Sequence, residues 1–285
     1  MYSKIIKTTM TSCVAVAGLA LASQSAMAAP FTYSDFSDTS ELQLNGSAAA
    51  PLGPNNALRL TNSTSQSGSA FRTNAIALNS NVSFSTAFQF RISDPVGSSD
   101  SDGQGADGLV FVVQTVANNV GGSGGGIGYQ GISNSVGIEF DTWNNGAWDD
   151  YNGNHVGINT NGNINSVVQA NIGTSNPGRL NNGAVWNAWV DYDGLNNLLE
   201  VRLSDGILRP VASLLSYTVD LTAILGSTNA FVGFTSGTGS AGGDHDILNW
   251  TFSDSFQPIG VPEPATMALL SLGLVGLGLR RRKKT

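Results

Sequence analysis

The clearest pattern in the chain is an alternation of apolar and polar positions over short segments. In one such segment, Phe88, Phe90 and Ile92 alternate with Gln89 and Arg91. Successive side chains of a β-strand point to opposite faces, so a period of two predicts a strand with one buried face. Similar segments recur along the chain, and we expect strands in each of them: 108–114, 136–141, 185–192, 197–204, 215–220, 230–235 and 247–253.

The segments between the expected strands are rich in Asn, Gly, Ser and Thr. We expect loops at 61–69, 121–128 and 236–243, and no helix before the C-terminal tail. No unit repeats at a fixed period. Positions 29–253 hold one domain, since a β-sandwich of roughly this length folds as a single unit. The pattern predicts an all-β fold, a sandwich or jelly roll of antiparallel sheets.

The first residues have the three parts of a secretory signal. Lys4 and Lys7 precede an apolar stretch, and a small-residue cleavage site follows that ends at Ala28. The alternative is a membrane anchor, for which the apolar stretch is short against the ~20 residues of a span. We expect residues 1–28 to be removed. Cys13, the only cysteine, lies within them, so the exported chain has no disulfide.

The last residues form a second targeting device. A Val-Pro-Glu-Pro motif at 261–264 precedes an apolar stretch at 265–279 and a basic cluster at 280–284. Segment 261–285 resembles the PEP-CTERM sorting segment of Gram-negative bacteria, which implies a C-terminal apolar helix, processing by an exosortase and transient membrane association. Residues 254–260 would be a linker to it. A plain C-terminal anchor is the alternative, although the apolar part is short for a permanent span.

The exported part of the chain is strongly acidic. Seven of the 13 basic residues lie in the two terminal segments, whereas all 20 acidic residues lie between positions 30 and 279. The exported domain therefore carries a net charge of about −14. Nucleic-acid binding needs a basic patch, so this class of partner is excluded.

Candidate metal ligands cluster in the middle of the chain. Glu139 and Asp141 alternate in an expected strand, so their side chains share one face. Asp149 and His155 follow after a short polar loop. Three carboxylates and an imidazole suit a hard or borderline divalent metal. The loop offers two further oxygen donors, from the side chain of Asn145 and the carbonyl of Trp143.

This cluster resembles the metal-binding signature of the legume-type (L-type) lectins. Segment 136–149 reads V-G-I-E-F-D-T-W-N-N-G-A-W-D, and His155 follows at a short distance. The resemblance covers roughly residues 31–253. Further pieces that resemble this family occur in its order, at 106–111, 124–131, 189–194, 231–236 and 245–252.

The resemblance implies a concanavalin-like jelly roll that holds two neighbouring metal ions. A transition metal such as Mn²⁺ would be held by Glu139, Asp141, Asp149 and His155. Ca²⁺ would be held by Asp141, Asp149, Asn145 and the carbonyl of Trp143. The two shared aspartates would bridge the ions, whose charge offsets the repulsion between the carboxylates.

The resemblance also implies a carbohydrate site beside the calcium ion. Its expected residues are Asp107, Gly128, Trp143, Asn145, Ser240 and Ala241. The Asp107 carboxylate, preceded by a cis peptide bond from Ala106, would accept hydrogen bonds from two sugar hydroxyls. The Gly128 N–H would donate to the sugar, and the Trp143 ring would stack on it. The expected loop 239–244 would supply the remaining backbone donors.

Two other classes of protein remain as alternatives to an exported lectin that binds cell-surface or matrix polysaccharide. Glucanases of the same fold class carry E-x-D-x-x-E, but here Asn144 stands where the second glutamate would be. We therefore expect no enzyme, and we interpret His245 and Asp246 as fold residues rather than a catalytic pair. A structural protein of the envelope or matrix, without sugar binding, is the second alternative. The sequence is compatible with an oligomer.

Overall fold

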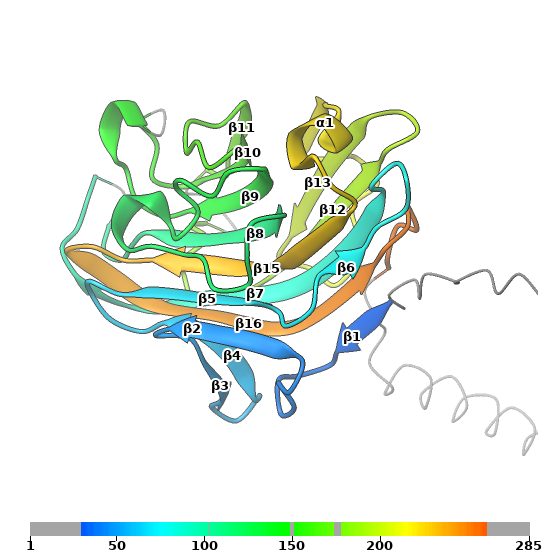
Figure 1. Ribbon diagram of the computed structural model, residues 1–285. Coiled ribbons are helices and arrows are strands. Elements are labelled where there is room, and N and C mark those ends of the chain that lie inside the picture. Colours follow the sequence, from blue (N-terminus) through cyan, green and yellow to red (C-terminus); the bar gives the residue numbers. More distant parts are fainter. Residues whose placement is uncertain (1–29, 102, 149–150, 174–177, 261–285) are drawn as a thin grey trace, which may run out of the picture.

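The computed structural model describes residues 30–101, 103–148, 151–173 and 178–260. It contains two antiparallel sheets of eight strands each, stacked on one another (Figure 1). The first sheet has the order β14 (Leu215–Thr218), β13 (Leu198–Ser204), β12 (Val185–Asp193), β7 (Phe84–Gly97), β16 (Ala241–Ser253), β4 (Ala57–Thr61) and β3 (Ala49–Leu52), with β1 (Phe31–Tyr33) beside β16.

The second sheet is the one that carries the candidate metal ligands. Its order is β11 (Val168–Asn171), β10 (His155–Thr160), β9 (Ser135–Asp141), β8 (Gly108–Gln114), β15 (Asn229–Gly237), β5 (Ser67–Arg72) and β2 (Leu42–Gly46), with β6 (Ile76–Ala77) beside β15. The predicted all-β sandwich is confirmed. The expected signal peptide, sorting segment and sorting helix lie outside the described residues.

Aromatic side chains from both sheets meet in the main core. Phe88 and Phe90 alternate on β7 and point toward the second sheet, as their period predicts. The rings of Phe88 and Phe234 lie 5.0 Å apart, and those of Phe90 and Phe140 lie 4.8 Å apart. Burying such side chains contributes about 1.5–3 kcal/mol each, so this contact holds the two sheets together.

A smaller apolar cluster covers the other face of the second sheet. Phe71 on β5 points away from the main core, opposite to its neighbour Ala70. It packs under the segment that follows β8, together with Val110, Val112, Ile127, Tyr129, Ile132 and Ile164. This cluster seats a Gly-rich segment on the sheet.

The structure corrects the expectation that no helix precedes the tail. Helix α1 (Leu221–Leu225) is short and well capped, and two 3-10 turns also occur, η1 (Gly124–Gly126) and η2 (Gly146–Trp148). The Asp220 carboxylate accepts a hydrogen bond from the Ala223 N–H, and Gly226 ends α1 with a φ of 64°. A five-residue helix is too short for a periodic apolar pattern.

The expected loops around 236–243 are partly strand. β15 extends to Gly237 and β16 begins at Ala241, because Ala241 pairs with Gly97 at the end of the long strand β7. The segments that follow β8 and β9, green in Figure 1, therefore lie at one end of the sandwich beside a tight turn between β15 and β16.

The expected linker contacts the first sheet. The Gln257 N–H donates to the Ser85 hydroxyl oxygen over 3.0 Å, so part of 254–260 lies along β7. Among the described residues, the structure contains no helix that is long and apolar enough to cross a membrane.

Candidate functional site

Asp107 lies where the ends of two strands meet. The peptide bond between Ala106 and Asp107 is cis, as expected. The Asp107 N–H donates to the carbonyl of Gly237 over 3.3 Å, and the Asp107 carbonyl accepts from the Thr142 N–H over 3.0 Å. These bonds tie Asp107 to the end of β15 and to the residue after β9. Asp107 is 4% exposed, so its position is set by the sandwich.

The Gly-rich segment packs against the turn between β15 and β16 and against the loop that is expected to bind metal. The Gly124 N–H donates to the carbonyl of Thr238 over 3.0 Å. A Cβ atom placed on Gly125 would lie only 2.5 Å from the Asn145 side chain. Gly125 is therefore the glycine that faces Asn145, and it was not among the residues expected to bind sugar.

Gly128 is buried against β15 and has a φ of 71°. A Cβ atom there would lie 2.8 Å from the Thr235 side chain, so only glycine fits. The next residue, Tyr129, accepts hydrogen bonds from the Ser135 hydroxyl and the Gly162 N–H. Burial raises the pKa of Tyr129 to about 12, which keeps the phenol neutral. Gly128 and Tyr129 thus anchor the segment.

The loop after β9 is organised by short-range hydrogen bonds. The Trp143 N–H donates to Asp141 Oδ1 over 2.7 Å. The Asn144 N–H donates to Asp100 Oδ2 over 2.9 Å, and the Asn144 side chain bonds the carbonyl of Tyr151 and the Gly146 N–H. Trp143 and Asn145 are half-buried. Asp100 is a further site-organising residue that no sequence motif indicated.

Glu139 and His155 face each other across the β9–β10 pair. His155 is the register partner of Asp141. Glu139 lies two residues before Asp141 on β9, so the two carboxylates share one face of the strand. Glu139 Oε1 lies 3.2 Å from His155 Nε2 and accepts from the Ser166 hydroxyl over 2.6 Å. The Asn159 side chain donates to the other carboxylate oxygen.

The His155 ring lies between a backbone carbonyl and the Glu139 carboxylate. His155 Nδ1 lies 3.1 Å from the carbonyl oxygen of Asn152, which only accepts, so Nδ1 carries the proton. In a neutral ring, Nε2 then presents its lone pair to Glu139 Oε1, another acceptor. A proton or a metal ion between these two atoms removes the repulsion, and such a backbone contact is typical of metal-binding histidines.

The described residues hold only part of the expected metal site. They contain no group of three or more His, Cys, Asp or Glu side chains placed to hold a metal ion. Asp149, the residue expected to complete both ligand sets, lies outside the described residues.

The turn between β15 and β16 closes the site. A Cβ atom on Gly239 would lie 3.9 Å from Asp107 Oδ2, so this glycine passes close to the carboxylate. Ser240 is exposed, and its carbonyl accepts from the Ser98 N–H over 3.0 Å. Ala241 is buried and pairs with Gly97. Of the two expected turn residues, only Ser240 reaches solvent.

Comparison with known proteins agrees with this geometry. The family model described as "Legume lectin domain" matches residues 28–266, which is most of the chain. The chain belongs to the legume lectin family. A second model, described as "PEP-CTERM protein-sorting motif", matches residues 260–283. Both resemblances stated from the sequence are confirmed.

Relatives of this legume lectin chain include plant receptor kinases. It is 37% identical over 179 residues to the L-type lectin-domain containing receptor kinase VIII.1 of Arabidopsis thaliana, a match that covers 61% of the chain and 24% of that kinase. It is 31% identical over 245 residues to the putative L-type lectin-domain containing receptor kinase I.10 of the same plant, a match that covers 79% of this chain and 38% of that kinase. The chain thus spans about a quarter to two fifths of the relatives it matches.

Solved legume lectins share the whole sandwich. The Bauhinia forficata lectin in complex with GalNAc superimposes with a TM-score of 0.64 at 26% identity, covering 79% of this chain and 96% of that lectin. The winged bean acidic lectin complexed with methyl-α-D-galactose superimposes with a TM-score of 0.63 at 28% identity, and the match covers 78% of this chain and 96% of that lectin. The metal-free form of Griffonia simplicifolia lectin I-B4 superimposes with a TM-score of 0.63 at 27% identity, and the match covers 79% of this chain and 99% of that lectin.

The two residues that resemble a catalytic pair point to opposite faces of β16. Asp246 accepts hydrogen bonds from Arg59 and Arg91, while His245 Nδ1 lies 2.6 Å from the Thr61 hydroxyl inside the sandwich. Burial lowers the pKa of His245 to about 4. The prediction that these are fold residues agrees with this arrangement.

Proposed function

We propose that this legume lectin chain is an exported, metal-dependent carbohydrate-binding protein with one sugar site at Asp107. The observation that carries the proposal is the convergence of four separate segments around one buried carboxylate. Asp107, Gly125, Asn145 and Gly239 come from four loops that contact one another: Gly239 approaches Asp107 and Gly124, and the adjacent Gly125 approaches Asn145.

The metal ions would occupy the segment from β9 to β10. Glu139, Asp141, Asp149 and His155 would hold Mn²⁺ or another transition metal. Asp141, Asp149, Asn145 and the carbonyl of Trp143 would hold Ca²⁺. The facing acceptors Glu139 Oε1 and His155 Nε2 support a cation there. The ions would hold the loop that presents Asn145.

The sugar would be bound mainly through hydrogen bonds. The Asp107 carboxylate and the Asn145 amide would bond its hydroxyls, and the half-buried Trp143 ring would stack on its apolar face. The backbone N–H groups of Gly128 and Ser240 would donate to the sugar, as expected from the sequence. We add Gly125, because it lies directly against Asn145. Ala241, buried in the ladder, would act by holding the turn.

Catalysis is not part of the proposal. Retaining glycoside hydrolysis needs two carboxyl groups, one on each side of the scissile bond. At the position of the missing glutamate, the Asn144 side chain holds the loop by bonding Gly146 and Tyr151. Asn144 therefore stabilises the loop, and its amide supplies neither the acid nor the nucleophile that hydrolysis needs at this position.

The targeting segments suggest where the lectin acts. The match of residues 260–283 to the PEP-CTERM motif supports export to the cell envelope or extracellular matrix of a Gram-negative bacterium. An exosortase-type enzyme would cut near 261–264 after transient anchoring by the tail. Intact-mass measurement on protein from the native host would test this, and a mass that includes residues 280–285 would show a plain anchor instead.

Glycan binding with and without chelator tests the main proposal. The exported domain is applied, with Ca²⁺ and Mn²⁺, to a glycan array that includes galactose, N-acetylgalactosamine, glucose and mannose as monosaccharides. We expect binding that EDTA abolishes. Asp107→Ala should remove it, since each bond to a charged acceptor contributes roughly 1.5–3 kcal/mol. If the wild type binds no glycan with its metals present, the chain is a structural protein that keeps the lectin fold.

A further inference from the structure

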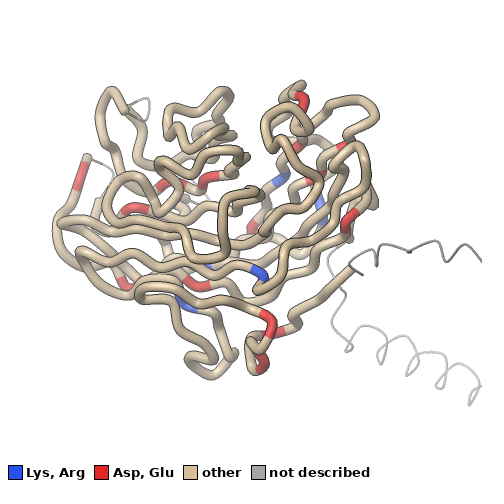
Figure 2. Tube along the Cα trace, in the orientation of Figure 1, with Lys and Arg blue, Asp and Glu red and all other residues tan. Residues whose placement is uncertain are grey.

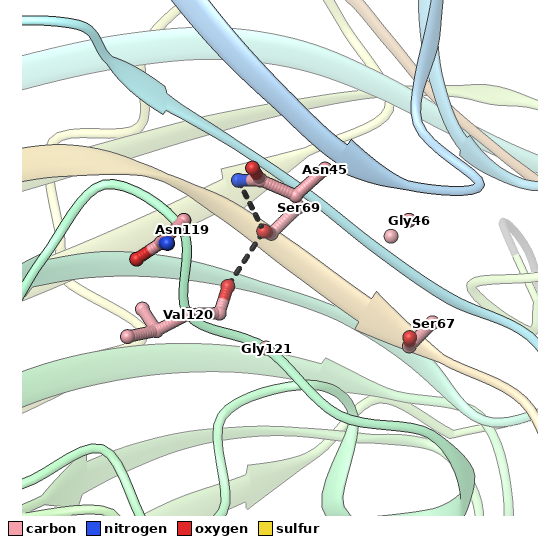
Figure 3. Close-up of a pocket in the computed structure, with 8 residues that line it drawn as sticks. Asn45, Gly46, Ser67, Ser69, Asn119, Val120 and Gly121 are labelled. Atoms are coloured by element: carbon pink, nitrogen blue, oxygen red, sulfur yellow. Dashed lines mark hydrogen bonds between the residues drawn. The ribbon is translucent and has the colours of Figure 1, made fainter.

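A hollow lies on the same face of the second sheet as the Asp107 site. It has a volume of about 150 Å³, enough for several water molecules. Its floor is formed by Ser67 and Ser69 of β5, and its walls by Asn45 of β2 and by Asn119 to Gly121 of the segment after β8 (Figure 3). Ser67 and Ser69 alternate with Ala70, a core residue, and share the face of Phe71.

The hollow and the Asp107 site share one wall. Ser67 is the register partner of Gly237, and the carbonyl of Gly237 accepts the hydrogen bond from the Asp107 N–H. Gly121 lies between Ser69 and Gly128, since a Cβ atom on it would be 3.3 Å from Ser69 Oγ and 3.9 Å from the Gly128 oxygen. Ser67 and Asp107 are thus separated by about two strand spacings, roughly 10 Å.

The lining of the hollow suits hydroxyl groups. It contains amides, hydroxyls and backbone groups, and no charged or aromatic side chain. Part of this lining already holds the wall in place: the Asn45 amide donates to Ser69 Oγ over 3.1 Å, and Ser69 Oγ donates to the carbonyl of Val120 over 2.6 Å. Within the described part of the chain, the side chains of Ser67 and Asn119 make no hydrogen bond, which leaves them available to a ligand.

We propose that this hollow is a second sugar subsite, which binds a neighbouring residue of a glycan whose terminal residue occupies the Asp107 site. The inference rests on the proposed function. It predicts that the lectin recognises an oligosaccharide rather than one sugar alone. The Ser67 hydroxyl and the Asn119 amide are the specificity-determining groups, while Asn45 and Ser69 position the wall.

The test compares two variants with a matched control on the metal-loaded exported domain. Asn119→Ala removes an exposed amide, and Ser67→Leu fills the hollow from its floor. Asn55→Ala removes another exposed asparagine, in the turn between β3 and β4 on the first sheet. The probes are galactose, N-acetylgalactosamine, glucose and mannose, each as a monosaccharide and as the terminal residue of di- and trisaccharides on a glycan array, followed by calorimetry.

We expect the wild type to bind at least one oligosaccharide about tenfold more tightly than its terminal monosaccharide. Asn119→Ala should lose about fivefold of this gain, the equivalent of one hydrogen bond, and Ser67→Leu should lose all of it. Both should keep the monosaccharide affinity, and Asn55→Ala should match the wild type.

Two results would overturn the subsite while leaving the lectin proposal intact. One is a wild type that binds monosaccharides and oligosaccharides equally. The other is an Asn119→Ala protein, folded by its melting curve, with an unchanged oligosaccharide gain. A wild type that binds no sugar at all would instead overturn the proposed function itself.

Discussion

Asp246 on β16 and Glu139 on β9 are both almost completely buried, yet they have different polar partners. Asp246, on the first sheet, accepts two hydrogen bonds from Arg59 and one from Arg91. Glu139, on the second sheet, accepts hydrogen bonds from Asn159 and Ser166 and faces His155 Nε2, and it pairs with no arginine or lysine among the described residues.

The contrast extends over the chain. Basic residues are few (Figure 2), and the domain between its two targeting segments has six arginines and no lysine. Five of these arginines pair with carboxylates elsewhere: Arg59, Arg72, Arg91, Arg202 and Arg209. A buried carboxylate without a protein cation is costly. The buried Asp246 of the first sheet is thus paired with arginines, whereas the buried Glu139 of the second sheet has polar contacts and, as we propose, a metal ion. Arg72 of the second sheet pairs with the exposed Glu41 instead.

Removing an arginine from the first sheet should have the largest effect on stability. Arg59→Met takes two bonds from the buried Asp246 and should lower the free energy of unfolding by about 3 kcal/mol. Arg91→Met removes one bond to the same carboxylate, from a more exposed side chain, and should cost clearly less. Urea unfolding would measure both. Equal and small losses would mean that Asp246 does not depend on its arginines.

Metal removal should lower the melting temperature through the carboxylates of the second sheet, and not through Asp246 of the first sheet. Binding to the native state stabilises it by about 2.7 kcal/mol at a hundredfold excess over Kd. Thermal melting in Ca²⁺ plus Mn²⁺ against EDTA should show this difference for the wild type and for Asp246→Asn. Glu139→Gln should lose most of it, since the charge that requires a cation is gone. An unchanged difference in Glu139→Gln would separate Glu139 from the metal site.

His245, buried between the sheets, should make stability depend on pH. Its pKa is about 4 in the folded state and about 6.5 when unfolded, so the unfolded chain binds more protons between these values. Stability should therefore fall as pH drops, by roughly 1.5 kcal/mol from pH 6.5 to 5. The measurement is urea unfolding in EDTA, with His245→Gln as the reference. A parallel fall in both proteins would assign the pH dependence to other groups.

Substitution of two glycines in the Gly-rich segment should distinguish an effect on glycan affinity from an effect on the stability of the fold. Gly125→Ala places a Cβ against the Asn145 side chain, which can move, whereas Gly122→Ala meets no atom within 4 Å. We expect both to change stability by less than about 1 kcal/mol. Only Gly125→Ala should weaken glycan binding, by about tenfold, because it displaces Asn145, the side chain that we propose binds sugar and calcium. Equal affinities in calorimetry would remove Gly125 from the site.

The sequence by itself determined the fold class and the family. A period of two is a local property, so strands such as β7, β8, β9 and β12 could be located from the side chains they bury. The motif from Glu139 to His155 is also local, and so is the Ala106–Asp107 element. The residue types in these two motifs indicate the expected chemistry of the candidate site without any knowledge of the fold.

Tertiary structure decided the rest. β2 to β5 and β10 to β11 are short and have few alternating apolar residues, such as Leu42 and Leu44 of β2, so pairing with neighbouring strands stabilises them. The contacts of Gly125 with Asn145, Asp100 with Asn144, and Gly239 with Asp107 join residues 20 to 132 positions apart. Such contacts follow from how two sheets stack and where their loops emerge, which no local period encodes.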